Sequence, residues 1–376
     1  MVSRRMVLGA GLGGLALVSA GGIWRVTRTP QVAYAPWKLA GSPPEDVRLD
    51  AFRHAILAPN PHNRQPWLIR LIGDYAAEVS CDVDKRLPVT DPFDRQITIG
   101  FGTFLELARM AAAERGYRMD MEAFPAGEAQ PRLNESPVAK LTFVKDATVK
   151  PDSLFGAVPV RRSNKEVYDL TRAVEDKKLQ QIATVGGAFS SDPEFVAKLR
   201  EQILIGIETE LLTDDANMES VELMRIGYDE IDANPDGIDL GGPMIEAGKL
   251  TGQIDRAQLA DPDSQASNIG RDQMAETYGS IGALYWITTP TNTRLDQLET
   301  GRQYVRANLQ ATKLGLSMHP MSQTLQEYEE VAESYRVVHT MLDATGEERV
   351  QMLARLGYGP TIGPSPRWPL DTHIKA

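Results

Sequence analysis

The spacing of apolar and polar residues divides the chain into expected helices and strands. Leu49, Phe52 and Ile56 fall on one face of a helix that should begin near residue 44. Three prolines follow closely and should end this helix: Pro59, Pro61 and Pro66. The apolar run that comes after them therefore belongs to a different element.

Short runs rich in β-branched and aromatic residues predict strands. Residues 67–72 (WLIRLI) and 77–83 should form a hairpin, 141–144 a further short strand, and 278–289 (YGSIGALYWITT) a buried central strand. Residues 97–115 carry apolar positions at helical spacing and predict a long helix. The mixture indicates an α+β protein in which helices pack on antiparallel sheets.

Comparison of the chain with itself indicates an internal duplication. Six residues match six others at a constant offset of 199: Gly102, Leu105, Ala108, Met110, Ala112 and Gly116 correspond to Gly301, Tyr304, Ala307, Leu309, Ala311 and Gly315. The helix start at Glu45-Asp46 matches Glu175-Asp176 at an offset of 130. The second half therefore holds 69 more residues between these helices than the first (199 minus 130).

This surplus should lie at about residues 191–275. Helix-like pieces at 195–212 and 221–231 alternate there with turns, which suits a lid over a binding site. A surface insertion that only adds packing is the alternative.

The N-terminal residues 1–30 differ from the rest of the chain. Arg4 and Arg5 directly precede an apolar run, which is the pattern of a twin-arginine export signal; a plain membrane anchor is the alternative. Residues 9–14 fit G-x-G-x-x-G, but no strand precedes them, so we reject a dinucleotide-binding loop. Residues 31–44 should be a linker. We therefore expect a periplasmic or other extracytoplasmic protein, attached to the membrane only if the signal is not cleaved.

Charge and cysteine content narrow the classes of function. The 376 residues carry a formal net charge of -11, which argues against nucleic-acid binding. Cys81 is the only cysteine, so neither an intrachain disulfide nor a thiolate metal cage is possible. The five histidines have no close metal-ligand spacing, and no metal is expected.

Four separated segments together resemble the nitroreductase family of FMN enzymes. They are residues 58–67 (APNPHNRQPW), 161–165 (RRSNK), 315–322 (GLSMHPMS) and 356–370, which contains LGYGP and PRWPL. They are similar to the family's A-P-S-x-x-N-x-Q-P-W loop, its R-x-S-x-[RK] phosphate segment, the turn beneath the isoalloxazine, and its closing G-Y-P and R-x-P-L. Each pattern is weak alone, but the four together cover most of residues 45–376.

The resemblance implies a nitroreductase-like fold with FMN held between two halves. Ordinary nitroreductases are homodimers whose flavin lies across the subunit interface, so residues 45–150 and 151–376 would be tandem halves that mimic such a dimer. The first half lacks R-x-S-x-[RK] and the second lacks N-x-Q-P-W, which implies one FMN per chain. In the tandem-half branch of the family, a lid can cover the flavin.

The basic residues suit the dianionic phosphate of FMN. Arg161 and Arg367 can each donate two hydrogen bonds to it, while Lys165 adds a charge and Ser163 a hydroxyl. A solvated surface pair is the alternative for Arg161 and Arg162.

The remaining candidate residues would contact the flavin itself. Asn60, Asn63 and Gln65 offer amides suited to ribityl hydroxyls and pyrimidine carbonyls, with turn chemistry as the alternative, above all for Asn60, where the family usually has serine.

By resemblance, Pro320, Met321 and Ser322 lie beneath the isoalloxazine, and the Ser322 backbone N–H donates to flavin N5. Many relatives have Glu-Gly where this chain has Ser322-Gln323, so the substrate pocket should differ. We expect His319 to be a loop histidine rather than a proton donor.

Two functions follow. The first is an FMN-dependent oxidoreductase that passes hydride or electrons to a nitroaromatic, quinone or similar flat acceptor, with the cofactor carrying the chemistry. Because an extracytoplasmic compartment lacks an NAD(P)H pool, a redox partner or a quinol donor is expected. The second is a flavin-binding protein without turnover, whose lid blocks access to FMN.

Overall fold

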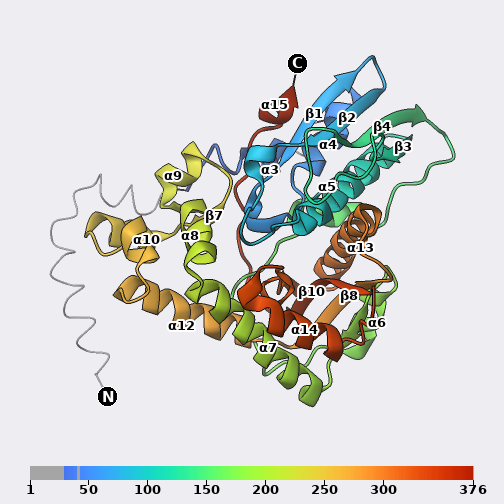
Figure 1. Cartoon of the computed structure of the whole chain (residues 1–376). Coiled ribbons are helices and arrows are strands. Elements are labelled where there is room, and N and C mark those ends of the chain that lie inside the picture. The colour runs from blue at the N-terminus through green and yellow to red at the C-terminus, as the bar shows by residue number, and fades with distance from the viewer. Residues whose placement is uncertain (1–28, 40–42, 376) are drawn as a thin grey trace.

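The computed structural model describes residues 29–39 and 43–375 (Figure 1). Helices pack on mainly antiparallel sheets, which confirms the predicted α+β class. Within these residues no helix is long and apolar enough to cross a membrane. The predicted export signal lies outside the described residues.

The first half contributes four strands to a five-stranded sheet. They are β1 (Trp67–Ile72), β2 (Ala76–Cys81), β3 (Tyr117–Ala123) and β4 (Pro137–Lys145), in the order β1-β2-β4-β3 with every neighbouring pair antiparallel. The β1–β2 hairpin was predicted. Strand β3 was missed because its sequence, YRMDMEA, is mostly polar and exposed.

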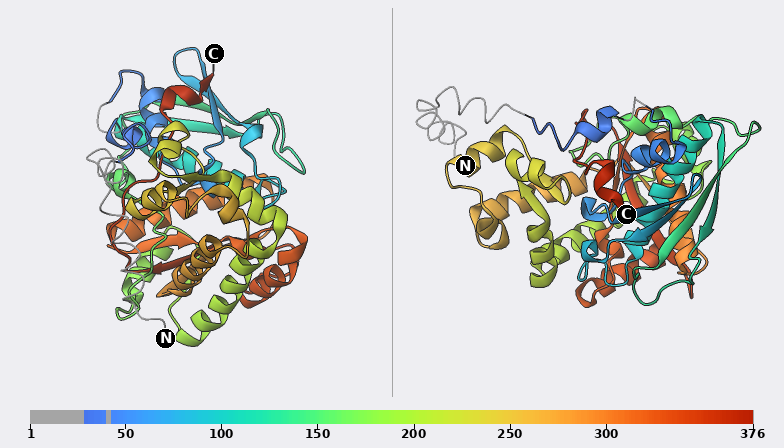
Figure 2. Two further views of the ribbon diagram at one scale, coloured as in Figure 1. Left: turned by 90° about the vertical axis from the view of Figure 1, so that its left-hand side faces the viewer. Right: turned by 90° about the horizontal axis from the view of Figure 1, so that it is seen from above.

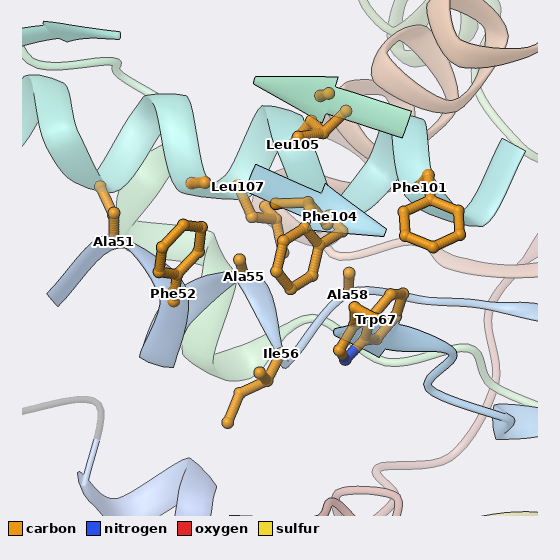
Figure 3. Close-up of a cluster of buried hydrophobic side chains, with 14 of the residues drawn as sticks. Ala51, Phe52, Ala55, Ile56, Ala58, Trp67, Phe101, Phe104, Leu105 and Leu107 are labelled. Atoms are coloured by element: carbon orange, nitrogen blue, oxygen red, sulfur yellow. The ribbon is translucent and has the colours of Figure 1, made fainter. Parts of the chain in front are cut away.

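Helices α4 (Val47–Ala55) and α5 (Arg95–Glu114) form the core of the first half with this sheet (Figure 3). Trp67 of β1 is fully buried and stacks on Phe104 of α5, with ring centroids 4.8 Å apart. Phe52 of α4 stacks on the same ring at 6.0 Å. Such pairs add about 0.5–1.5 kcal/mol each to apolar burial. They fix the end of the loop at residues 58–66, immediately before Trp67.

The second half repeats the same strand order. Strands β5 (Ala188–Ser190), β8 (Ala283–Thr289), β9 (Ser317–Pro320) and β10 (Arg349–Gly357) form an antiparallel sheet in the order β5-β8-β10-β9. In both sheets the strands, numbered along the chain, are therefore arranged first, second, fourth, third. Helix α6 (Asp176–Ala183) precedes the second sheet as α4 precedes the first. Helix α13 (Arg294–Lys313) follows its second strand as α5 does.

Helices α5 and α13 lie against each other between the two sheets (Figure 1). Leu309 of α13 is part of the core of the first half. Glu106 of α5 is buried there and contacts Arg302 and Arg306 of α13 at 3.3 and 2.8 Å. Burial alone would raise the pKa of Glu106, but these arginines and Arg109 hold it below its usual range. The two halves are therefore joined through a shared core and a buried charge network.

A long insertion joins β5 to β8. Residues 191–282 occupy the place that residues 73–75 occupy between β1 and β2. The insertion contains α7 (Pro193–Leu212), α8 (Asp214–Leu223), β6 (Met224–Ile226), α9 (Tyr228–Ala233), β7 (Ile238–Leu240), α10 (Pro243–Leu250), α11 (Arg256–Ala260) and α12 (Gln265–Gly279). It extends to one side of the two sheets (Figure 2).

Two expected elements in this region differ from the structure. The expected helix over 221–231 is interrupted at Gly227, whose φ of +83° a helix does not allow, and β6 and α9 form on either side. The expected strand over 278–289 begins only at Ala283, because α12 continues to Gly279.

The C-terminal residues leave the second half and return to the first sheet. Helix α15 (Leu370–His373) leads into β11 (Ile374–Lys375), which pairs with β1 in parallel. Helix α14 (Ala332–Met341) lies between β9 and β10. Short 3-10 helices complete the chain: η2 (Pro61–Asn63), η3 (Val83–Lys85), η4 (Phe155–Val160), η5 (Gln323–Leu325) and η6 (Glu329–Val331).

Residues 31–44, expected to be a linker, contain a packed segment. Helix α3 (Ala35–Leu39) forms there, and both Ala33 and Trp37 are buried. Five helical residues are too few to show a periodic pattern. Their partners lie at the C-terminus and in the insertion, which the local sequence does not indicate.

Candidate functional site

The loop before β1 has an unusual backbone. His62, Asn63 and Gln65 all have positive φ, at 44°, 52° and 51°. Asn60 holds this conformation, since its Oδ1 accepts a hydrogen bond from the backbone N of Gln65 at 2.7 Å and its amide nitrogen donates to Ala58 O at 3.1 Å. In the structure Asn60 therefore has the turn role that was the alternative to a flavin contact.

Asn63 and Gln65 tie this loop to the C-terminal residues. Asn63 Oδ1 accepts a hydrogen bond from Arg367 Nη1 at 2.6 Å. Gln65, fully buried, accepts one from the backbone N of Trp368 at 2.9 Å and donates one to Pro235 O at 2.8 Å. Both amides are thus engaged with protein groups, and Asn63 positions one of the predicted phosphate ligands.

Arg161 and Arg367 point at the same backbone carbonyl. Arg161 Nη2 donates to Leu57 O at 2.9 Å, and Arg367 Nη2 donates to it at 3.3 Å. Each arginine is only 2% exposed. Arg161 is therefore not a solvated surface residue, and the fold brings it against an arginine from the end of the chain.

Within the part of the chain that the structure describes, neither arginine forms a salt bridge with a carboxylate, and only the more distant Asp239 partly offsets the charge of Arg367. Three buried guanidinium nitrogens, Arg161 Nε and Nη1 and Arg367 Nε, have no hydrogen-bond acceptor among the described residues. Burial lowers the pKa of Arg161 to about 10. Burial and the neighbouring Arg161 charge lower the pKa of Arg367 to about 9. Buried like charges with unused donors favour an anion between them.

The rest of the predicted phosphate segment faces the same region. Ser163 lies within hydrogen-bonding reach of the Tyr304 hydroxyl on α13, and Tyr304 in turn lies near Arg161. Lys165 is exposed. Burial, together with the Lys165 charge, lowers the pKa of His62 to about 4. Lys165 therefore lies near the amide loop as well as in the phosphate segment.

Strand β9 and the residues after it form the predicted flavin turn. Pro320 pairs with Ala354 of β10, and Met321 N donates to Leu353 O at 2.8 Å. Among the described residues, the backbone N–H of Ser322 has no acceptor. The Ser322 N–H, which the resemblance maps to flavin N5, is thus the first backbone donor after β9 that the sheet does not use.

His319 lies in β9 and not in a loop. Its Nδ1 accepts a hydrogen bond from Arg355 Nε at 3.2 Å, which places the proton of the neutral ring on Nε2. Burial and the Arg355 charge hold its pKa well below the usual value. Arg355 is held by Thr277 O at 2.7 Å and lies over the ring of Tyr168 at 3.8 Å. His319 is therefore a fixed, neutral core histidine.

The tip of the insertion, residues 234–240, lies on the amide loop. Besides the bond from Gln65 to Pro235, the backbone N of Gly237 donates to Asn63 O at 3.2 Å. Asp239 of β7 is in electrostatic reach of Lys165 and Arg367, although burial raises its pKa.

Asp236 joins the insertion tip to three other parts of the chain. Its carboxylate contacts Lys85 at 3.2 Å, Arg225 at 2.6 Å and the indole nitrogen of Trp368 at 3.1 Å. Burial alone would raise the pKa of Asp236, but these three donors hold it below its usual range. Asp236 is thus a buried carboxylate that connects the insertion to the first half and to the C-terminal residues.

The sequence reasoning missed Trp37, whose ring lies 4.5 Å from the Arg162 guanidinium and 5.5 Å from that of Arg367. A large aromatic residue inside an apparent linker was a signal that could have identified it.

Pockets among the described residues also occur whose lining does not include Arg161 or Arg367. One, of about 470 Å³, is lined by Tyr168 and Glu276 among others; another, of about 520 Å³, is lined by residues including Phe93 and Arg294. No cluster of histidine, cysteine and acidic residues suited to a metal ion occurs in residues 29–39 and 43–375.

The chain matches no family model. It is 24% identical over 328 residues to the Mycobacterium tuberculosis protein named "Putative NAD(P)H nitroreductase Rv3131", a match that covers 85% of this chain and 89% of that protein. A second M. tuberculosis protein, "Putative NAD(P)H nitroreductase acg", is 37% identical over 81 residues, which are 21% of this chain and 24% of that protein. The chain is similar to nitroreductases.

Solved structures give a weaker likeness. A nitroreductase with bound FMN from Bacteroides fragilis has a TM-score of 0.32 at 14% identity, covering 56% of this chain and 90% of its own. The FMN-dependent nitroreductase NfnB from Mycobacterium smegmatis, in complex with NADPH, has a TM-score of 0.32 at 14% identity, covering 53% and 84%.

Proposed function

We propose that this chain is an exported FMN-dependent oxidoreductase of the nitroreductase type, which passes hydride or electrons from flavin N5 to a nitro, quinone or similar flat acceptor. The observation that carries the proposal is the pair Arg161 and Arg367, which are buried together and form no salt bridge with a carboxylate among the described residues. The similarity to a mycobacterial protein named as an NAD(P)H nitroreductase, over 85% of the chain, supports the same family.

The phosphate end of FMN fits the residues present. Arg161 and Arg367 have unused N–H groups, and Ser163 and Lys165 complete a basic, hydrogen-bonding set around them. A dianion there would neutralise two charges that otherwise repel each other and lack solvent. The amides of Asn60, Asn63 and Gln65 are bonded to protein groups. The two arginines, in contrast, offer N–H donors that no group in the described residues accepts.

Tandem halves are part of the proposal. Support comes from the shared strand order of the two sheets and from the equal placement of α5 and α13 after the second strand of each. The candidate site takes its amide loop from the first half and its phosphate residues from the second, as a flavin between the two subunits of a dimer would require.

At the other end of the flavin, the bound cofactor would supply the hydride chemistry. The Ser322 N–H is available to donate to N5, and Pro320 and Met321 hold the turn against β10. His319 is fixed by Arg355 and would keep its proton on Nε2. None of these residues needs to act as a nucleophile.

Export determines the electron donor in this proposal. The paired Arg4 and Arg5 before an apolar run favour the twin-arginine route, which moves folded proteins and so would carry the flavin already bound. Outside the cytoplasm a quinol or a redox partner would replace NAD(P)H. Fractionation of cells, comparing the chain with an Arg4→Lys/Arg5→Lys variant, tests this step, since the variant should stay in the cytoplasm.

A second function is favoured by the insertion tip. Pro235 and Gly237 bond directly to the amide loop, as a lid over FMN would, and a closed lid would make the chain a flavin-storing protein without turnover.

The flavin of the purified protein tests both functions. We expect a yellow protein from which heating releases FMN, identified by mass, at about one per chain. FAD or absence of flavin from protein refolded with FMN would contradict both. Reduction of the bound flavin by NADPH, a quinol or dithionite then separates them: oxidoreductase activity requires a physiological donor to reduce it, whereas a storage protein responds only to dithionite.

A further inference from the structure

The segment expected to be a linker closes one side of an arginine cluster, defined here as Arg161, Arg162 and Arg367. Trp37 lies beside this cluster, with its ring centroid 4.5 Å from the Arg162 guanidinium and 5.5 Å from that of Arg367. An aromatic face attracts cations electrostatically and also excludes water from them. One indole thus faces two positive groups, neither of which forms a salt bridge with a carboxylate among the described residues.

Arg162 belongs to this cluster, although its position in the sequence indicated no role in phosphate binding. Its Nη1 donates to Pro159 O at 3.0 Å and to Arg161 O at 2.7 Å, while its buried Nε has no acceptor in the part of the chain that the structure describes. Burial lowers the pKa of Arg162. The three arginines are therefore linked through Leu57 O on one side and Trp37 on the other, and each retains at least one unused donor.

Backbone contacts hold Trp37 in this place. Its indole nitrogen donates to Ser365 O at 2.8 Å, and Arg367 N donates to Ala33 O at 2.8 Å. Ala33 N donates to Asp232 Oδ1 of the insertion at 3.1 Å. Residues 33–37 therefore connect the C-terminal arm to the insertion, across the arginine cluster.

We propose that Trp37 is a binding residue of the phosphate site, and that docking of residues 33–37 and binding of a phosphate monoester strengthen each other. The proposal rests on the proposed FMN function for the identity of the ligand. The indole face partly offsets the repulsion among the arginines and keeps water from one side of them, so that their free N–H groups bond to the phosphate with less competition. By linkage, phosphate stabilises the docked segment to the same extent that docking strengthens phosphate binding.

The test compares FMN with riboflavin, which lacks the phosphate. Trp37→Leu keeps an apolar side chain but removes the aromatic face, and Trp37→Phe keeps an aromatic face without the indole N–H. We expect Trp37→Leu to weaken FMN binding about tenfold and leave riboflavin binding unchanged, with Trp37→Phe between it and the wild type. Tyr75→Leu, at an exposed aromatic residue of the β1–β2 turn, is the matched control and should change neither affinity.

Equal weakening of FMN and riboflavin in Trp37→Leu, or no change in either, overturns the proposal. If the wild type binds neither flavin, the FMN function fails, and thermal unfolding with inorganic phosphate decides the role of Trp37 alone. Phosphate should then raise the unfolding temperature of the wild type more than that of Trp37→Leu. An equal rise in both proteins, or no rise, would contradict a role of Trp37 in phosphate binding. Hydrogen exchange of residues 30–39 should slow on adding FMN or phosphate, and unchanged exchange contradicts the linkage.

Discussion

Gly102 of α5 and Gly301 of α13 lie directly against each other where the two helices pack. A Cβ on Gly102 would fall 2.9 Å from Gly301 Cα and 2.0 Å from Leu298 O. A Cβ on Gly301 would fall 2.8 Å from Gly102 Cα and 2.0 Å from Ile99 O. The two glycines are one of the pairs that the 199-residue offset relates in the sequence, and both sides of the contact are nearly identical.

A second pair at the same offset, Arg95 and Arg294, starts these two helices. Arg95 Nη1 donates to Gln351 O in the second half at 3.0 Å, and Arg294 Nη2 donates to Pro131 O in the first half at 3.0 Å. Each helix is thus anchored at its start in the opposite half. This exchange is what a duplicated subunit packed on its own copy would produce, and it supports the tandem proposal.

The glycine contact gives the first prediction. Gly301→Ala places a methyl group on the backbone of α5, so the helices must separate, and we expect the free energy of unfolding to fall by at least about 1–3 kcal/mol. Gly270→Ala is the control, because nothing lies within 4 Å of a Cβ there and it sits inside α12; alanine should stabilise it by up to about 1 kcal/mol. Urea unfolding measures both. Equal stability of the two variants would show that α5 and α13 do not pack at this contact.

The β1–β2 hairpin and helix α5 were predictable because their signals are local. Strand β1 is a mostly apolar run that includes β-branched and aromatic residues, burial alternates along β2, and α5 and α13 share apolar and glycine positions that a self-comparison detects. Strands β3 and β9 were not predicted, for different reasons. Strand β3 is mostly exposed and polar, and β9 is only four residues long beside a glycine turn.

The candidate site was predictable only by residue type. Arg161 and Arg367 were expected together, and the fold places both on Leu57 O. What they touch depends on chain segments far apart in sequence, so the bond from Asn63 to Arg367 could not be inferred. Trp37 gave a signal as an aromatic residue in an apparent linker, but its place over the cluster could not be inferred from it.

The second prediction concerns the two buried arginines. Arg161→Gln and Arg367→Gln should each weaken FMN binding by on the order of 30–100-fold, the loss of a charge-assisted hydrogen bond to a desolvated phosphate. Without ligand, the same variants should be as stable as the wild type or more so, because each removes a buried charge that forms no salt bridge among the described residues and that repels the other arginine. Arg336→Gln, at an exposed residue of α14, should affect neither. Flavin titration and thermal unfolding of the apoprotein measure the two effects; retained FMN affinity in both variants would place the phosphate elsewhere.

The third prediction is a loss of stability in mild acid. His339 is buried, its Nε2 accepts a hydrogen bond from Val350 N at 3.1 Å, and burial lowers its pKa to about 4 from 6.5. Between these values the unfolded chain binds a proton that the folded chain does not, so the free energy of unfolding should fall as pH decreases from 6.5 towards 4. The slope approaches about 1.4 kcal/mol per pH unit for one such group. His339→Gln should show a shallower slope, and denaturant unfolding at pH 7 and pH 5 compares the two; parallel slopes are the contrary result.

The last prediction concerns the contacts of Asp236. Asp236→Asn keeps the size of the side chain but removes the charge that holds Lys85 and Arg225, so residues 234–240 should detach from the amide loop. We expect faster hydrogen exchange in these residues and about tenfold faster release of FMN, because the tip bonds to Asn63 and Gln65 beside the arginine cluster.

Asp263→Asn, on the same insertion but with an exposed side chain, is the control and should change neither rate. The wild type should show the same loosening in acid: the pKa of Asp236 is held below its usual range, so its stabilising charge is complete above the ordinary aspartate pKa and is lost as pH falls through the lowered one. If Asp236→Asn releases FMN at the wild-type rate while its tip exchanges faster, the tip does not control access to the flavin and the insertion is not a lid.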